Sequence, residues 1–201
     1  TEHGQMDEKV KRVINKFGRI DILINNGGIS QRALVEDTRL EVDKQIMNIN
    51  YFGTIALTKA VLPYMIRQKS GHFAVMSSVT GKIGVPLRSA YAASKHALFG
   101  FFDTLRAENF TRNIHVTMIC PGFVRTQVSV NALTGDGTPQ NAMDDATNKG
   151  MKPAELSKKI CKAIKQKKKE VYFGGKEIMG IYLRRYLPNL FFSIIRKQKV
   201  T

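Results

Sequence analysis

The chain has few of the residues that mark several special classes of protein. Its 201 residues include two cysteines and six prolines, and the sequence contains no internal repeat or low-complexity segment. Two cysteines cannot form the multi-bridge framework of a small secreted domain, and neither Cys120 nor Cys161 lies in a C-x-x-C pair or a metal-ligand cluster. We therefore expect one globular domain without a metal site, in a reducing compartment such as the cytoplasm.

Long apolar runs are also missing. No stretch approaches the roughly 20 apolar residues that a membrane-spanning helix needs, and the chain does not begin with the pattern of a signal peptide. Hydrophobic residues make up 43% of the sequence, which is ordinary for a protein with a buried core. We expect the chain to be soluble or at most peripheral to a membrane.

Acidic residues are scarce relative to basic ones. The sequence contains 16 Asp and Glu and 32 Lys and Arg, which gives a formal net charge of +16. Such a charge favours binding of phosphates, nucleic acid or anionic lipid. Part of the excess is a lysine run that is expected on the solvated face of a helix. The run consists of Lys158, Lys159, Lys162, Lys165, Lys167, Lys168 and Lys169. No nucleic-acid-binding module accompanies this charge, so we expect no nucleic-acid partner.

Helical and strand patterns alternate along the chain. An amphipathic helix over residues 6–17 ends at Gly18, and an apolar strand over 20–24 runs into the glycine turn that follows it. The later elements are a helix at 39–68, a strand at 72–76, a helix at 89–109, a strand at 114–119, a helix at 153–168 and a strand at 171–173. This order predicts an α/β fold with a parallel sheet and helices on both faces. The polar segment at about 127–150 is too long for an ordinary connection and is a candidate substrate lid.

Tyr91 and Lys95 form the first motif that could take part in catalysis. Residues four apart on a helix share a face, so a nearby ammonium would stabilise the phenolate and lower the tyrosine pKa from about 10 towards neutrality. A general acid for a carbonyl oxygen needs such a pKa. Alone, the Y-x-x-x-K pattern more often belongs to two surface residues. Ser78 follows the strand at 72–76 and reaches the same sheet edge, although serine after a strand is usually only a turn residue.

Five elements together resemble the short-chain dehydrogenase/reductase family. They are Asn25-Asn26-Gly27-Gly28, Asn50, Ser78, Tyr91-x-x-x-Lys95 and Pro121-Gly122-x-x-x-Thr126, in the order and spacing of that family. Residues 17–23 and 25–32 resemble the dehydrogenase/reductase member 7 subgroup, which has Gly27 where the family usually has alanine. The resemblance implies a doubly wound Rossmann-type fold. It also implies hydride transfer between a nicotinamide cofactor and an alcohol or carbonyl substrate. The cofactor is expected to be NADP or NAD, with NADP slightly favoured.

The resemblance also implies a role for each matched residue. Tyr91 would be the acid and base, Lys95 would lower its pKa and bind the nicotinamide ribose, and Ser78 would hold the substrate oxygen. Asn50 would bend the long helix and hold a water that links Lys95 to solvent, whereas a mid-helix asparagine by itself is more often a solvent-facing residue. The other residues expected to line the cofactor are Asn25, Gly27, Gly28, Pro121, Gly122, Val124 and Thr126. At Gly28 the missing Cβ would let the backbone approach a ligand closely.

One feature of the family is absent from the printed sequence. A complete member begins with a strand and a Thr-Gly-x-x-x-Gly-x-Gly loop that holds the pyrophosphate. By spacing, Thr1 falls just after the third strand of such a fold, so the strand at 20–24 is expected to have an exposed apolar edge. We expect the chain alone to be poorly stable and to show no measurable dehydrogenase activity. The alternative to an enzyme is a truncated or degenerate member that acts as a non-catalytic binding or scaffold module.

Two expectations concern the surface of the protein. The helices at 39–68 and 89–109 have apolar residues on more than one face, which predicts a two-fold contact and a dimer or tetramer. Those residues include Phe52, Leu57, Leu98, Phe101, Phe102 and Leu105. Residues 1–175 are expected to form the Rossmann-type unit and 176–201 an apolar, basic helical tail that Pro188 breaks in two. The tail is either a lid over a pocket for an apolar substrate, such as a steroid, retinoid or lipid-like carbonyl, or an interfacial contact with an anionic membrane.

Overall fold

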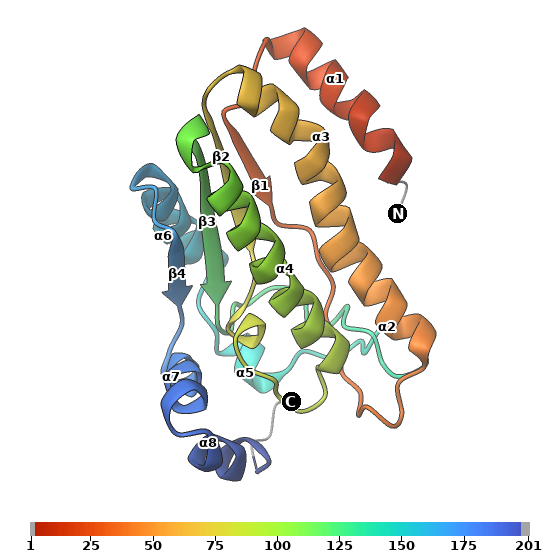
Figure 1. Ribbon diagram of the computed structural model, residues 1–201. Helices are drawn as coiled ribbons and strands as arrows, with labels where there is room; N and C mark the ends of the chain where they lie inside the picture. Colours follow the sequence, from red (N-terminus) through yellow and green to blue (C-terminus); the bar gives the residue numbers. More distant parts are fainter. Residues whose placement is uncertain (1–2, 198–201) are drawn as a thin grey trace.

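The computed structural model describes residues 3–197 and shows an open α/β fold built on a parallel sheet (Figure 1). Its strands are β1 (Ile22–Asn25), β2 (Gly71–Met76), β3 (Ile114–Pro121) and β4 (Glu170–Phe173). They lie in the order β1-β2-β3-β4, and each neighbouring pair is parallel. The predicted fold class is therefore confirmed. Residues 1–2 and 198–201, which include the end of the predicted tail, lie outside the described residues.

The helices follow the predicted order closely. They are α1 (Met6–Phe17), α2 (Leu40–Met47), α3 (Gly53–Arg67), α4 (Ser89–Glu108), α5 (Asp145–Asn148), α6 (Pro153–Lys165), α7 (Met179–Tyr186) and α8 (Pro188–Ile195). A π-helical turn, Asn48–Phe52, joins α2 to α3, so the long helix predicted at 39–68 is confirmed as one element with a local distortion. α1 ends at Gly18 with φ +79°, where glycine carries no steric cost.

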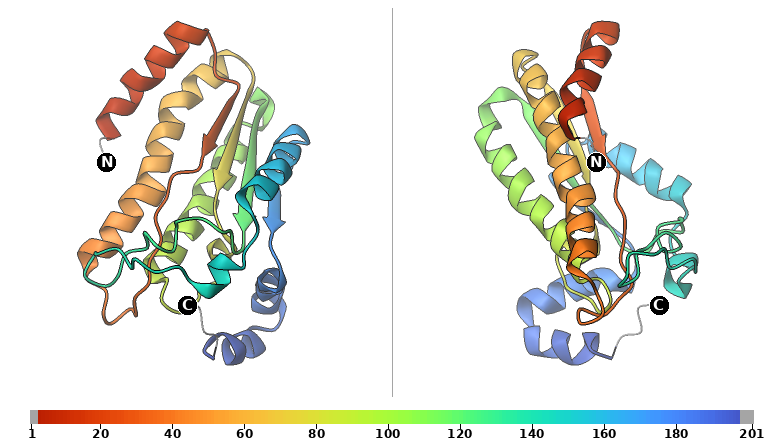
Figure 2. Two further views of the ribbon diagram at one scale, coloured as in Figure 1. Left: turned by 180° about the vertical axis from the view of Figure 1, so that it is seen from behind. Right: turned by 90° about the vertical axis from the view of Figure 1, so that its right-hand side faces the viewer.

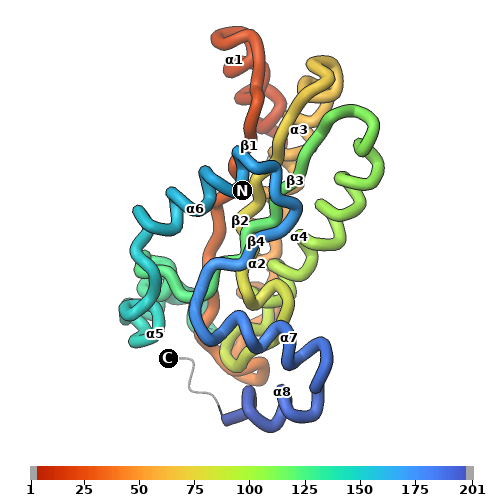
Figure 3. The backbone as a smooth tube through the Cα atoms, turned by 90° about the vertical axis from the view of Figure 1, so that its left-hand side faces the viewer, coloured from red at the N-terminus to blue at the C-terminus, as the bar shows by residue number. Residues whose placement is uncertain are grey.

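The helices form a layer on each side of the sheet. α1, α3 and α4 lie on one side of the strands and α6 on the other (Figures 2 and 3). The larger core is on the α3–α4 side, where Phe73 and Met118 from the strands and Phe102 from α4 are fully buried. A smaller cluster packs α6 on the other face through Ala74, Ile119 and Ile164. Strands buried on both faces explain the continuous apolar runs of β2 and β3.

β1 lies at the edge of the sheet and is less well covered than the other strands. Leu23 packs into the core beside α3, whereas Ile22 and Ile24 point to the opposite face and are 47% and 53% exposed. Within residues 3–197, no element covers that face of β1. The predicted exposed apolar edge is thus confirmed.

The apolar residues of the two long helices divide between the core and the surface. Leu98, Phe102 and Leu105 form the face that packs in the core of the single chain. Phe52 is 48% exposed and remains available on the surface. The helical spacing alone did not distinguish buried from exposed apolar residues, because α4 packs against both the sheet and the long helix.

Two surface predictions agree with the structure. Every lysine of the run between Lys158 and Lys169 is exposed, as expected for a solvated face. Pro188 is the first residue of α8, so the tail divides into two short helices at the predicted place. In the part of the chain described here, no helix has both the length and the apolar character to cross a bilayer.

Candidate active site

The predicted site residues gather at the carboxyl edge of the sheet. β1, β2 and β3 are parallel, so their last residues Asn25, Met76 and Pro121 meet at one edge, the lower end of the arrows in Figure 1. Asn25 is buried, and its side-chain amide donates to Thr58 Oγ1 on α3 over 3.0 Å. This hydrogen bond fixes the end of β1 against the long helix. Ligands of open α/β folds bind at such an edge.

Ser78, Tyr91 and Lys95 are brought together there. Ser78 leaves β2, and its Oγ accepts a hydrogen bond from Thr80 N over 3.1 Å and donates to Pro121 O over 3.4 Å. It also lies close enough to the Tyr91 hydroxyl to lower the pKa of that group. Tyr91 and Lys95 both lie on α4, and Lys95 Nζ is 5.8 Å from the centre of the Tyr91 ring. Lys95 is 4% exposed, and its ammonium donates to the Met76 carbonyl over 2.8 Å. The geometry therefore places a hydroxyl, a phenol and an ammonium in one cluster.

The predicted direction of the Tyr91 pKa is wrong for this structure. Burial raises the pKa of Tyr91 above its ordinary value, and this effect outweighs the neighbouring Ser78 hydroxyl and the positive charges of Arg88 and Arg32, which lower it. Burial also lowers the pKa of Lys95 to about 8. The prediction treated Tyr91 as a phenol in water with a cationic neighbour. In the folded chain, the loss of solvent around the phenol has a larger effect on its pKa than the neighbouring charges.

Asn50 is fully buried and links three parts of the site. Its Oδ1 accepts from Ile29 N over 2.8 Å, and its Nδ2 donates to Ile29 O and to Ser94 Oγ over 2.9 and 3.0 Å. Asn50 lies in the π-helical turn, which confirms the predicted local distortion of the long helix. Its side chain thus holds the loop after β1 against α4, and the alternative of a solvent-facing asparagine is excluded.

The two glycines after β1 have different surroundings. A Cβ at Gly28 would lie 3.1 Å from Asn50 Oδ1 and 3.4 Å from Lys95 Nζ, whereas a Cβ at Gly27 would meet nothing within 4 Å. The missing side chain at Gly28 therefore leaves room directly beside Asn50 and Lys95. The space at Gly27 is compatible with the alanine that is usual there in the family that the sequence resembles.

The segment after β3 contacts a residue that the sequence did not single out. Glu177 Oε1 accepts from Phe123 N over 3.3 Å, and its side chain fills the space beside Gly122, so that a Cβ there would overlap the carboxylate. Val124 forms an isolated bridge with Met151, and Thr126 Oγ1 accepts from Val128 N over 3.4 Å. Pro121 and Gly122 thus border the cluster of Ser78, Tyr91 and Lys95, whereas Val124 and Thr126 lie farther along the loop.

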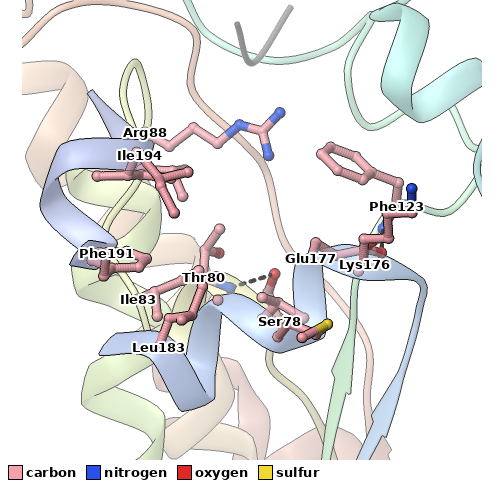
Figure 4. Close-up of a pocket in the computed structure, with 16 residues that line it drawn as sticks. Ser78, Thr80, Ile83, Arg88, Phe123, Lys176, Glu177, Leu183, Phe191 and Ile194 are labelled. Carbon is pink, nitrogen blue, oxygen red and sulfur yellow. Dashed lines mark hydrogen bonds between the residues drawn. The ribbon is translucent and has the colours of Figure 1, made fainter. Parts of the chain in front are cut away.

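A cavity of about 410 Å³ opens above Ser78 (Figure 4). Most of its lining is apolar, with Ile83 and Val85 on one side and side chains of α7 and α8 on the other. Arg88 and Glu177 add charged groups to the wall. A cavity that combines an apolar lining with a few polar groups is typical of a small-molecule site.

The comparisons with known proteins identify the family of the chain. The family model described as short chain dehydrogenase matches residues 1–136. The chain belongs to that family. It is 48% identical over 186 residues to dehydrogenase/reductase SDR family member 7B from Xenopus laevis, covering 92% of this chain and 58% of that protein. It is 46% identical over 200 residues to a Drosophila melanogaster SDR family protein 7-like dehydrogenase/reductase, covering 99% of this chain and 61% of the relative.

Solved structures of short-chain dehydrogenases share the fold. A short-chain dehydrogenase from Streptomyces avermitilis superposes with a TM-score of 0.80 at 25% identity, covering 97% of this chain and 75% of its own. A gluconate 5-dehydrogenase from Burkholderia cenocepacia, solved with NADP and tartrate, superposes with a TM-score of 0.62 at 27% identity, covering 64% and 50% of the two chains. The chain spans about three fifths of the length of the curated relatives named above.

Gln31 borders the candidate site, and the sequence did not single it out. Its side chain is fully buried, and its Oε1 accepts from Ala90 N over 2.9 Å and from Tyr91 N over 3.4 Å. Its Nε2 donates to Thr38 Oγ1 and Ser89 Oγ over 3.0 and 3.3 Å. A side chain from the loop after β1 therefore satisfies amides of the first turn of α4, which has no capping side chain of its own at Arg88.

The candidate lid is tied to the same loop. Asp144 forms a buried ion pair with Arg32, and Arg88 lies 3.5 Å from the same carboxylate. Burial raises the pKa of Asp144, but hydrogen bonds from Arg32 and Gln140 and the two positive charges outweigh it, so the pKa lies below its ordinary value. Backbone hydrogen bonds also join Leu133 to Ser30 and Arg32 over 2.9 and 2.8 Å. The segment at 127–150 is thus held against the site rather than extended from it.

Proposed function

We propose that the full-length protein is a nicotinamide-dependent oxidoreductase that interconverts an alcohol and a carbonyl compound, with Tyr91 as the acid and base. The observation that carries this proposal is the grouping of Ser78 and Tyr91 beside the buried ammonium of Lys95 and next to an apolar cavity. As a carbonyl group is reduced, its oxygen gains negative charge. A proton donor and a second hydroxyl placed beside that oxygen stabilise the charge and supply the proton.

In the direction of reduction, the substrate oxygen would accept hydrogen bonds from Ser78 Oγ and the Tyr91 hydroxyl. Tyr91 would transfer its proton to that oxygen as the carbonyl becomes an alcohol. The raised pKa of Tyr91 keeps the phenol protonated at neutral pH but also makes it a weaker acid, so its proton transfer would depend on the positive charges of Arg88 and Arg32 beside it. Lys95 would stabilise the phenolate that remains, and a lysine pKa of about 8 suits the return of a proton. In oxidation the same groups would act in reverse.

The residues around the cluster fit a nicotinamide cofactor. Gly28 leaves backbone exposed beside Lys95, and Pro121 and Gly122 border the cluster at the end of β3. Bound NADP or NAD would supply or accept the hydride, while Lys95 and the Asn25–Gly28 turn would hold its ribose groups. The NADP in the similar gluconate 5-dehydrogenase supports this class of cofactor. The apolar lining of the cavity supports an apolar alcohol or carbonyl substrate.

The test is Tyr91→Phe in the full-length protein, with Tyr64→Phe on α3 as a matched control. We expect Tyr91→Phe to lower turnover by roughly 10²- to 10⁴-fold, because the proton transfer is lost. Cofactor affinity, measured by nicotinamide fluorescence, should stay within about twofold, and Tyr64→Phe should change neither quantity. A Tyr91→Phe enzyme with the wild-type rate would overturn the assignment. A wild-type protein that binds neither NADP nor NAD would instead favour a non-catalytic scaffold.

A further inference from the structure

α7 and α8 have apolar side chains on two opposite faces. The inner face lines the cavity with Leu183 and Phe191 (Figure 4), and Ile195 also belongs to the lining. Phe191 is only 3% exposed. The outer face carries large side chains that are about half or more exposed, namely Tyr182, Tyr186, Leu187, Leu190 and Phe192. A pair of helices that served only as a lid would need just the inner face. The outer face therefore calls for a second explanation.

The outer face is also strongly basic. Arg184, Arg185, Arg196 and Lys197 are all exposed, and residues 178–197 contain no Asp or Glu. Arg184 lies 4.9 Å from the centre of the exposed Phe192 ring, so the charged and aromatic groups form one surface. Aromatic and aliphatic side chains flanked by arginine and lysine match the acyl boundary and the anionic headgroups of a lipid bilayer.

We propose that the outer face of α7 and α8 docks on an anionic lipid surface while the inner face roofs the cavity. Ile194 joins the two functions, because it lines the cavity and is also 45% exposed. The tail would thus be both a lid and a membrane contact, because each role uses a different face of the same pair of helices. If the proposed function holds, an apolar substrate reaches the cavity from the bilayer through the same surface.

A second copy of the chain fits this face less well. A two-fold contact brings the same surface patch of both copies together. Here it would bring four basic side chains from each copy into one interface, and this segment has no acidic residue to pair with them. Like charges that meet in this way oppose association. An anionic membrane instead neutralises each of these charges.

Vesicle co-sedimentation of the full-length protein tests the docking without any need for activity. The vesicles are phosphatidylcholine alone or phosphatidylcholine with 30% phosphatidylserine, a composition on the order of that in anionic leaflets. Arg184→Glu with Arg185→Glu should weaken binding to the anionic vesicles on the order of tenfold or more, since each basic residue near the surface matters. Leu187→Ser with Leu190→Ser should weaken it as well. These side chains are exposed, so the variants should keep the wild-type melting temperature.

The matched control reverses two charges on another exposed basic helix face. Lys158→Glu with Lys162→Glu changes the net charge by the same amount on α6. We expect this pair to lower binding by less than a third of the effect of the α7 pair. Equal effects of the two pairs would overturn the proposal, because attraction would then depend on overall charge alone. A Leu187→Ser and Leu190→Ser variant that dissociates an oligomer without changing vesicle binding would also overturn it, in favour of a second copy.

Discussion

The side-chain oxygen of Gln31 accepts a hydrogen bond from the backbone amide of Ala90 over 2.9 Å. Through this contact, a loop from the edge of the sheet caps the helix that carries Tyr91. The first amides of a helix have no partner within the helix, and a buried amide without a partner costs free energy. Gln31 is therefore placed to hold the first turn of α4, and with it the Tyr91 ring, in position over Ser78.

Gln31→Ala should lower both stability and turnover. Loss of the cap leaves buried amides unpaired, which should lower the free energy of unfolding by about 1–3 kcal/mol. If Gln31 positions Tyr91, kcat should fall while KM stays nearly constant. The control is Thr38→Val, which removes a partner of the Gln31 amide nitrogen but leaves the bond to Ala90. Urea unfolding and steady-state kinetics measure both effects, and equal kinetics of wild type and Gln31→Ala would refute the positioning role.

The two adjacent glycines offer a matched pair of substitutions. Gly28→Ala places a methyl group 3.1 Å from Asn50 Oδ1, so the hydrogen bonds of Asn50 must shift. We expect a loss of about 1–3 kcal/mol in the free energy of unfolding, as for other overpacked sites. Gly27→Ala, where a Cβ meets nothing within 4 Å, should stay within about 0.5 kcal/mol of the wild type. A Gly28→Ala variant as stable as Gly27→Ala would contradict the tight packing inferred at this turn.

Asp144→Asn should be far more damaging than removal of a surface carboxylate. It would leave the buried guanidinium groups of Arg32 and Arg88 without their shared anion, at a cost of about 3–5 kcal/mol. Glu155→Gln removes the partner of Lys159 in an exposed pair and should cost less than about 0.5 kcal/mol. Denaturant titrations of the two variants at one ionic strength give the comparison. Similar losses would show that Asp144 does not hold the 127–150 segment.

The pKa of Lys95 predicts a change of stability with pH. The folded lysine has a pKa of about 8 against an ordinary value of 10.5, so between these values the unfolded chain binds more protons. Stability therefore rises with pH across this window, and the penalty for burying the charge is complete below pH 8. Relative to Lys95→Met, the wild type should gain about 2 kcal/mol between pH 7 and pH 10. A constant difference between the two proteins would show that Lys95 titrates normally.

The full-length protein should form a dimer or tetramer. Phe52 is half exposed on the π-helical turn, and a partner that covers it would bury apolar surface. Light scattering at micromolar concentration measures the mass, and Phe52→Ser should shift it towards the monomer. A strict monomer in the wild type would refute this prediction.

Local patterns predicted most of the fold. The apolar run that became β2, the helical spacing of α1 and the break at Pro188 depend on neighbouring residues, and these features are confirmed. The grouping of Ser78 with Tyr91 followed from the parallel sheet, because strand ends meet at one edge. The exposed side of β1 was also expected, on the basis of the family fold.

Contacts between distant segments could not be predicted. Arg32 and Asp144 are far apart in the sequence, and Asp144 lies in a polar segment with no periodicity, so nothing local joins them. Gln31 resembles any other polar loop residue until the position of α4 is known. The pKa of Tyr91 was predicted in the wrong direction because the extent of its burial depends on the packing of the whole edge.

The all-parallel sheet has a consequence for how the chain folds. Ile22 pairs with His72, Gly71 with Ile114, and Met118 with Glu170, so each ladder closes a loop of roughly forty to fifty residues. Within residues 3–197, no hairpin joins two strands of the sheet, so the entropy of closing each loop is lost before the strands gain their contacts. Folding should therefore be slow compared with a helical bundle of the same size. During this delay the apolar strands are open to pairing with other chains, which makes refolding yield sensitive to protein concentration.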